Sequence, residues 1–200
     1  KTDLLNWDNN NLHGLGSNYF GLTASAAVGV LPEAADGSGF NIEGLEMAPN
    51  NTTAYVCFRA PIVPTTNRTK ALVVPVTNFT SLFSGNPTTG INATFGNPIE
   101  LDLGGRGIRE MRKNSANQYL ILAGPVDPAT DIAPSNFVLY YWTGDPSDQP
   151  YALTTSLSSS DIKGSFEGIV EVPNPLTNGS PIQLIADNGD NIYYNNGIIA

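Results

Sequence analysis

The residues with the clearest chemical potential are charged side chains beside the glycines of a repeated motif. The motif reads charged residue, Gly, then Leu or Ile, and it occurs at Glu43-Gly44-Leu45, Arg106-Gly107-Ile108 and Glu167-Gly168-Ile169. The three glycines stand 63 and 61 residues apart. Self-similarity at a nearly fixed period indicates a tandem repeat of one structural unit. Glu43, Arg106 and Glu167 are therefore predicted to occupy equivalent places in three units.

Short strand-like runs separated by turns surround each copy of the motif. Four short strands per repeat are typical of a β-propeller blade. We therefore predict an all-β fold, a β-propeller segment of about three four-stranded blades with a repeat of ~62 residues. A β-sandwich also has many short strands, but it does not explain the repeat. The predicted strands are Ile42–Met47, Ala54–Phe58, Ala71–Val76 and Ile99–Leu103, then Gly107–Met111, Tyr119–Ala123, Phe137–Trp142 and Ala152–Leu157, then Ile169–Val172, Ile182–Ala186 and Ile192–Tyr194.

The repeat also predicts the boundaries of the units. Residues 39–103 form unit one, 104–164 unit two and 165–200 an incomplete unit three. Residues 1–38 are expected to be a leader from a preceding blade, with a strand or short helix and a long loop. A closed propeller typically has four to eight blades. We therefore expect the chain to be a piece of a longer polypeptide; the alternative is a ring completed by separate chains.

Strand pairing is expected to bring the charged residues together. In an antiparallel pair, the start of the first strand lies beside the end of the second. Arg59 and Asp187 fall near the end of the second strand in units one and three, and Arg109 lies on the same side of its strand as Gly107. The predicted ligand-binding set at the mouth of the central channel is Glu43, Arg59, Arg106, Arg109, Glu167 and Asp187.

Two interpretations of this set stay open. Crowded, partly buried carboxylates need cations, and Arg is their best bidentate partner. The side chains could therefore simply pair with one another and hold neighbouring blades together. Alternatively, Arg59 and Arg106 could bind an anionic or polyol ligand, or Glu167 and Asp187 a cation.

Other motifs give weaker signals. Asp187-Asn188-Gly189-Asp190 resembles a fragment of a calcium loop but lacks the spaced ligands that end in Glu. Ca²⁺ is a candidate cofactor and none is certain. His13 is the only histidine and no G-x-S-x-G motif is present, which argues against a Ser-His-Asp hydrolase and a histidine metal site. Cys57 is the only cysteine and is predicted to be a buried, inert thiol.

Composition limits the partners. The net charge of −9 and the lack of a basic run argue against nucleic acid and anionic membranes. No apolar run reaches the roughly 18 residues of a membrane span. Acceptor sequences for N-glycosylation suggest a secreted glycoprotein that is extracellular, at the cell surface or periplasmic. They begin at Asn50, Asn51, Asn67, Asn78, Asn92 and Asn178.

Several segments together resemble a known family. They are Gly39-Phe40-Asn41-Ile42-Glu43-Gly44-Leu45, Phe58-Arg59-Ala60-Pro61, Leu101-Asp102-Leu103-Gly104-Gly105-Arg106-Gly107-Ile108-Arg109, Ile121-Leu122-Ala123-Gly124-Pro125 and Phe166-Glu167-Gly168-Ile169. They are similar to an uncharacterised β-propeller domain family of unknown function, itself distantly similar to propellers labelled "esterase-like activity of phytase". The resemblance covers residues from about 38 to 197. It implies a propeller that extends beyond this chain, and it supplies no activity or catalytic residues.

The sequence therefore favours a secreted or surface propeller module that binds a small ligand or a protein, and it favours a binding or scaffold module over an enzyme. One alternative is a calcium-dependent hydrolase of esters or phosphoesters, with the carboxylates of the site acting together with the metal. Another is a structural subunit that self-assembles through open blade edges.

Overall fold

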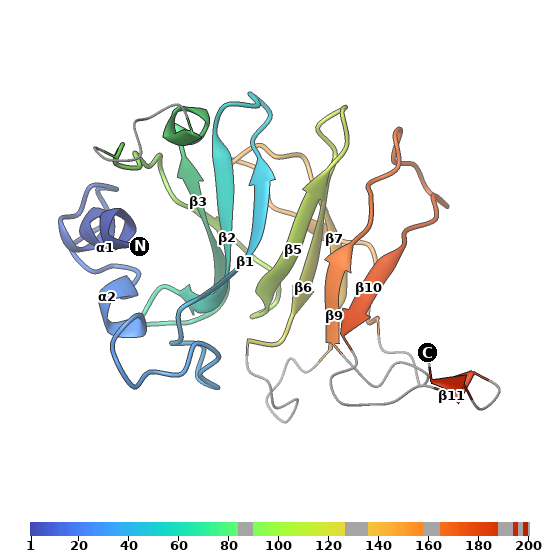
Figure 1. Cartoon of the computed structure of the whole chain (residues 1–200), viewed down its shortest axis with the longest axis horizontal. Coiled ribbons are helices and arrows are strands. Elements are labelled where there is room, and N and C mark those ends of the chain that lie inside the picture. The colour runs from blue at the N-terminus through green and yellow to red at the C-terminus, as the bar shows by residue number, and fades with distance from the viewer. Residues whose placement is uncertain (84–89, 127–135, 158–164, 188–193, 196–197, 200) are drawn as a thin grey trace.

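Antiparallel β-sheets make up most of the chain (Figure 1). The computed structural model describes residues 1–83, 90–126, 136–157, 165–187, 194–195 and 198–199. Two sheets have four strands, in the orders β1-β2-β3-β4 and β5-β6-β7-β8, and two sheets have two strands, β9-β10 and β11-β12. The all-β class is therefore confirmed, with helices added near the N-terminus.

The strands follow the predicted order closely in the first two units. The helices are α1 (Thr2–Asn9), α2 (Leu22–Ser25) and the 3-10 helix η1 (Phe79–Phe83). The strands of units one and two are β1 (Asn41–Met47), β2 (Ala54–Val63), β3 (Lys70–Val76), β4 (Ile99–Leu101), β5 (Gly107–Lys113), β6 (Tyr119–Gly124), β7 (Val138–Trp142) and β8 (Tyr151–Ala152). The remaining strands are β9 (Ser165–Ile169), β10 (Leu184–Asp187), β11 (Tyr194–Asn195) and β12 (Ile198–Ile199).

The apolar strands are buried because the units stack face to face. One core lies between the first and second sheets and includes Tyr55, Val73, Tyr119 and Trp142. Sheets that are covered on both faces read as nearly continuous apolar runs rather than alternating ones. This explains the runs in β2, β3 and β6, where most residues are buried.

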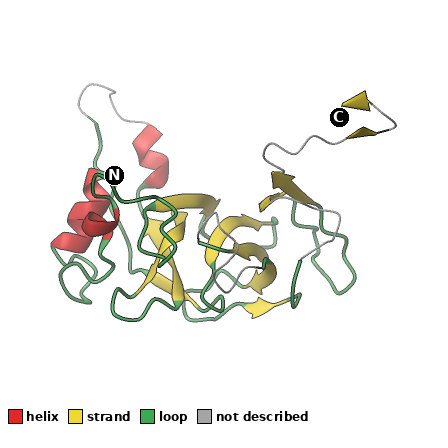
Figure 2. Ribbon diagram, turned by 90° about the horizontal axis from the view of Figure 1, so that it is seen from below, coloured by secondary structure: helices red, strands yellow, loops and turns green. Residues whose placement is uncertain are grey.

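Two further cores cover the outer faces of these sheets. The N-terminal helices pack Leu4, Trp7 and Leu22 against Leu72 and Val74 of β3, and Figure 2 shows them gathered at the end of the molecule that carries the N-terminus. On the other side, the third unit packs on the second sheet; this core includes Leu120, Leu122, Phe137, Phe166 and Ile169. Strands β1, β5 and β9 consequently lie side by side (Figure 1).

Of the strand or short helix expected in the N-terminal leader, the structure shows helices. Residues 1–38 contain α1 and α2 and no strand. Asp8 explains the local fold, because its buried carboxylate accepts hydrogen bonds from the backbone N–H of Phe20 at 3.0 Å and of Leu22 at 2.9 Å. A charged acceptor that ties α1 to the start of α2 favours a compact helical cap over an extended strand.

Several strand boundaries also need correction. The inner strand of unit three is Ser165–Ile169, because it pairs with Leu184–Asp187, and not the predicted Ile169–Val172. Strand β8 is only Tyr151–Ala152, although Leu153 N and Leu157 N still donate to carbonyls of unit two. Of the predicted strand Ile192–Tyr194, residues 192–193 lie outside the described residues, and Tyr194 belongs to β11.

Candidate functional site

Five charged side chains from the leader and the three units form a continuous series of contacts, here called the ion-pair chain: Glu33, Arg59, Glu43, Arg109 and Glu167. Arg59 Nη1 lies 2.7 Å from Glu33 Oε1 and 3.0 Å from Glu43 Oε1. Arg109 Nε lies 3.0 Å from Glu43 Oε2, and Arg109 Nη2 donates to Glu167 Oε1. Acidic and basic groups alternate throughout, so each arginine lies between two carboxylates.

β-Bulges set the orientation of four of these side chains. Antiparallel register is interrupted once between β5 and β6, at Arg109, and once between β9 and β10, at Glu167. Between β1 and β2 it is interrupted twice, at Glu43 and at Arg59. Each of these residues is the extra one, with no partner opposite. A bulge re-aims a side chain and often lies next to a functional site.

The register corrects the alignment of the second repeat. Ile42, Ile108 and Phe166 precede the bulged residue in the three inner strands. Arg109, and not Arg106, is therefore the structural counterpart of Glu43 and Glu167. The motif glycines suggested the other alignment because Gly107 lies beside a charged residue too, but Gly107 comes two residues before the bulge.

Arg106 makes other contacts than the predicted set required. Arg106 Nε and Nη2 donate to the backbone carbonyl and side-chain oxygen of Asn136, at 3.0 and 2.6 Å, and Nη1 donates to Leu103 O at 3.2 Å. These contacts fix the turn before β5 to the start of β7. Asp187 pairs with Ser165 at the end of the β9–β10 ladder. Residues 188–190 of the calcium-loop fragment lie outside the described residues.

Glu33 belongs to the ion-pair chain although the sequence did not single it out. It begins the loop 33–39, whose ends meet, since a Cβ on Gly39 would lie 1.9 Å from Pro32 O. Gly37 O accepts from Ile62 N at 2.9 Å, which anchors this loop to β2. The acidic, glycine-rich composition of the loop was the one available signal.

The arginines of the ion-pair chain are more deeply buried than its carboxylates. The side chains of Arg59 and Arg109 are each 4% exposed, whereas those of Glu33, Glu43 and Glu167 are 34%, 20% and 33% exposed. Three carboxylates against two guanidinium groups give the ion-pair chain a net charge of −1. The groups that face solvent are therefore mainly acidic.

The surroundings of Arg109 and Glu167 are partly apolar. The Arg109 guanidinium lies 5.8 Å from the ring centroid of Phe137, and its buried Nη1 has no hydrogen-bond partner among the described residues. Burial raises the pKa of Glu167 above its ordinary value, the Arg109 charge opposes this shift and Glu43 adds to it. The cluster therefore contains a carboxylate that burial disfavours in its charged form.

His13 and Cys57 have structural surroundings. His13 Nε2 lies 3.2 Å from Asp8 Oδ1, and its Nδ1 accepts from Leu15 N at 3.2 Å, so both ring nitrogens are occupied inside the N-terminal cap. Cys57 is buried, and burial raises the pKa of its thiol. Within the described ranges, no group of three or more His, Cys, Asp or Glu side chains could hold a metal ion.

Comparison with known proteins adds no relative. No family model, curated protein or solved structure matches the chain. The resemblance to a propeller family stays a prediction. No helix in the part of the chain that the structure describes is long and apolar enough to cross a membrane.

Proposed function

We propose that this chain is a segment of a secreted or cell-surface β-propeller that acts as a binding module, and that its ion-pair chain presents carboxylates to an organic cation. The blade-like arrangement supports the first part. Each of the first two units is a four-stranded antiparallel meander, and the first strands of three units lie next to one another. Face-to-face stacking of such units around an inner strand is the arrangement of propeller blades.

The observation that carries the choice of ligand is the difference in exposure within the ion-pair chain. Arg59 and Arg109 are enclosed and lie between carboxylates, so neither presents its guanidinium to an incoming anion. Glu33 and Glu167 keep about a third of their side-chain surface exposed. A cation approaching this surface meets acidic oxygens in a region of net negative charge, which favours its binding.

The same geometry also stabilises the fold. Arg109 belongs to unit two and contacts a carboxylate of unit one and another of unit three. Arg59 Nε also donates to Pro125 O of unit two at 3.1 Å. The two interpretations of the charged set therefore apply to different atoms: the arginines hold the units together, and the outer carboxylate edges are available to a ligand.

Titration calorimetry with spermidine, arginine methyl ester and CaCl₂ tests this proposal. We expect an organic cation to bind the wild type, and Glu167→Gln to weaken binding about fivefold, as expected for loss of ~1 kcal/mol of surface charge attraction. Glu171→Gln is the matched control, because Glu171 is exposed on the same segment outside the ion-pair chain. Equal affinities of both variants, or no binding of either organic cation, would reject the cation site. Binding of Ca²⁺ alone would favour the hydrolase alternative.

A second candidate function is assembly through a sheet edge. Among the described strands, β10 pairs only with β9, and Ile185 on β10 is 56% exposed. An edge strand with an apolar side chain is a template for pairing with another strand. Sedimentation at increasing concentration should then show association that Ile185→Lys abolishes, whereas monomers at all concentrations would exclude this candidate.

A further inference from the structure

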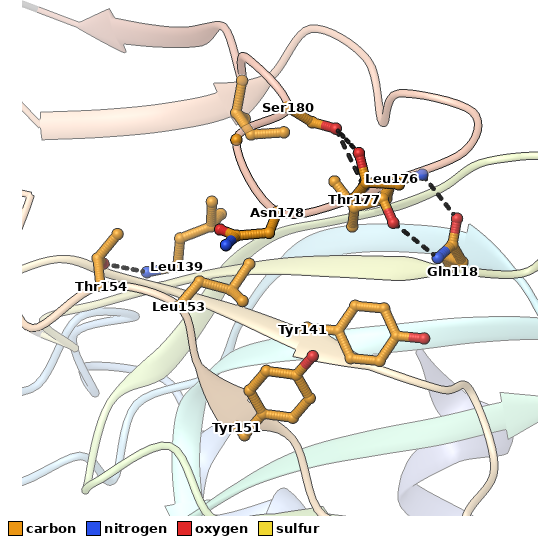
Figure 3. A pocket seen from close by; sticks show the side chains of 12 residues that line it. Gln118, Leu139, Tyr141, Tyr151, Leu153, Thr154, Leu176, Thr177, Asn178 and Ser180 are labelled. Carbon is orange, nitrogen blue, oxygen red and sulfur yellow. Dashed lines mark hydrogen bonds between the residues drawn. The ribbon is translucent and has the colours of Figure 1, made fainter.

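A cavity separate from the ion-pair chain lies between units two and three. Its volume is about 590 Å³, within the ~300–1,000 Å³ that is usual for small-molecule sites. Strands β7 and β8 form one wall, and the segment 176–182 of unit three forms the other. Figure 3 shows Tyr141 and Tyr151 next to each other on the first wall and Asn178 on the side opposite them.

The two tyrosines form an aromatic surface that ligands can reach. Tyr141 and Tyr151 are directly paired across β7 and β8, and their ring centroids lie 5.2 Å apart with planes tilted by 36°. Tyr151 is 59% exposed. Two neighbouring rings with amphipathic tips offer stacking area together with hydroxyl groups for hydrogen bonds. Such a surface suits a ligand that has both an apolar face and hydroxyl groups.

Hydrogen bonds hold the opposite wall in place. Gln118 Oε1 accepts from Leu176 N at 2.8 Å, and Gln118 Nε2 donates to Leu176 O at 3.1 Å. Ser180 Oγ accepts from Thr177 N at 3.0 Å. The loop that carries Asn178 is thus fixed to unit two before any ligand arrives, which lowers the entropic cost of binding.

Among the described residues, none that line the cavity is charged. Its polar groups are amides and hydroxyls, and the remainder is aromatic or aliphatic. An ionic ligand would find no counter-charge among these residues, and a purely apolar ligand would make no hydrogen bond with the amide of Asn178 or with the tyrosine hydroxyls. Aromatic rings for the apolar face of a pyranose, with amides and hydroxyls for its rim, match a neutral sugar.

We propose that this cavity binds a neutral oligosaccharide, with one sugar ring stacked on Tyr151 and Tyr141 and its hydroxyl groups bonded to Asn178 and the neighbouring hydroxyl side chains. This site does not depend on the proposed cation site, because the two share no residue. Asn178 also begins the acceptor sequence Asn178-Gly179-Ser180, so a glycan attached there would compete with the ligand.

Native affinity electrophoresis of the unglycosylated chain, produced in a bacterial host, tests the proposal. The gels contain one neutral polysaccharide each: hydroxyethylcellulose, xylan, galactomannan or amylopectin. We expect at least one to retard the wild type, and Tyr151→Ala to weaken that binding about tenfold, as for loss of a well-packed aromatic contact. Tyr151→Phe should retain most of the affinity because it retains the ring.

Controls separate the site from general effects. Phe83→Ala removes an aromatic side chain that is 77% exposed outside the cavity, and it should bind as the wild type does. Asn178→Ala should weaken binding without touching β8, which keeps the test valid if Tyr151→Ala fails to fold. Glu167→Gln should leave retardation unchanged.

Three outcomes would overturn the proposal. They are no retardation of the wild type in any neutral gel, binding of both Tyr151→Ala and Asn178→Ala that is unchanged from the wild type, and loss of retardation by Glu167→Gln, which lies outside the cavity.

Discussion

Replacing Arg109 with methionine tests whether the ion-pair chain holds the units together. Methionine keeps an unbranched side chain of similar length but removes the guanidinium that lies between Glu43 and Glu167. Arg112→Met is the matched control on the same strand. Arg112 is exposed, and it donates to the carbonyl oxygens of Ile169 and Val170 at 3.2 Å each.

The expected magnitude follows from the burial of the partners. Removing one member of a buried ion pair costs about 3–5 kcal/mol, because the other charge is left buried. Glu43 keeps Arg59 as a partner and Glu167 is 33% exposed, so the loss should lie near the lower limit, about 3 kcal/mol. Arg112→Met should cost about 1 kcal/mol, since Arg112 is exposed and its hydrogen bonds are the ordinary kind made to neutral carbonyl groups.

Urea unfolding followed by the fluorescence of the buried Trp7 and Trp142 measures both variants. A loss of about 3 kcal/mol corresponds to a decrease in Tm of roughly 6–12 °C for a chain of this size. The double variant Arg109→Met/Glu167→Gln should be more stable than the sum of the single effects implies, by about 1–2 kcal/mol, because the unpaired carboxylate is gone. If Arg109→Met loses no more stability than Arg112→Met, the ion-pair chain does not hold the units together.

Further predictions concern single positions elsewhere in the fold. Burial raises the pKa of Glu110 above its ordinary value of 4.5. The folded state therefore binds a proton at Glu110 more readily than the unfolded state does. The free energy of unfolding should increase as the pH falls from above the folded-state pKa toward about 4.5. Glu110→Gln should therefore be more stable than the wild type in urea at pH 8, and the difference should shrink toward pH 4; a difference independent of pH would contradict this. Gly107→Ala should cost about 1–3 kcal/mol in the same assay, because its Cβ would lie 2.1 Å from Arg59 O, whereas Gly168→Ala meets no atom closer than 3.8 Å and should be neutral or slightly stabilising. Asp8→Ala should cost about 3–5 kcal/mol, because it leaves two buried backbone N–H groups without their charged acceptor, and a loss below 1 kcal/mol would show that the N-terminal cap folds without it.

The strands of units one and two could be predicted because their apolar runs are long and bounded by turn residues. The end of β2 shows the limit of this reasoning. The strand continues past the predicted end at Phe58 to Val63, because residues 60, 62 and 63 are buried as well and Ile62 and Val63 pair with β3. For residues 1–38 the sequence left a strand and a short helix open, because Asp8 contacts backbone groups twelve and fourteen residues away and no local pattern signals such contacts.

Part of the charged cluster was also visible in the sequence. Glu43, Arg59, Arg109 and Glu167 were predicted to gather on one face, and the structure brings these four into contact. The prediction placed Arg106 at the position that Arg109 occupies, because the repeats were aligned on residue identity. A charged residue next to a glycine occurs at the turn before β5 in unit two and at the bulge in units one and three. Only the hydrogen-bond register separates the two cases, and register depends on partner strands.

The bulges explain how charged side chains reach the enclosed space between the inner strands of neighbouring units. In a regular ladder, the side chain that follows a buried Ile108 would point to the opposite face of the sheet, toward unit three and away from β1. One extra residue at Arg109 shifts the alternation and turns the strand more sharply. The same extra residue at Glu43 and Glu167 brings three consecutive inner strands into the same local geometry. The bulged residues of units one, two and three are acidic, basic and acidic, so neighbouring inner strands attract each other. This order favours the observed stacking over one that places two inner strands with bulged carboxylates next to each other.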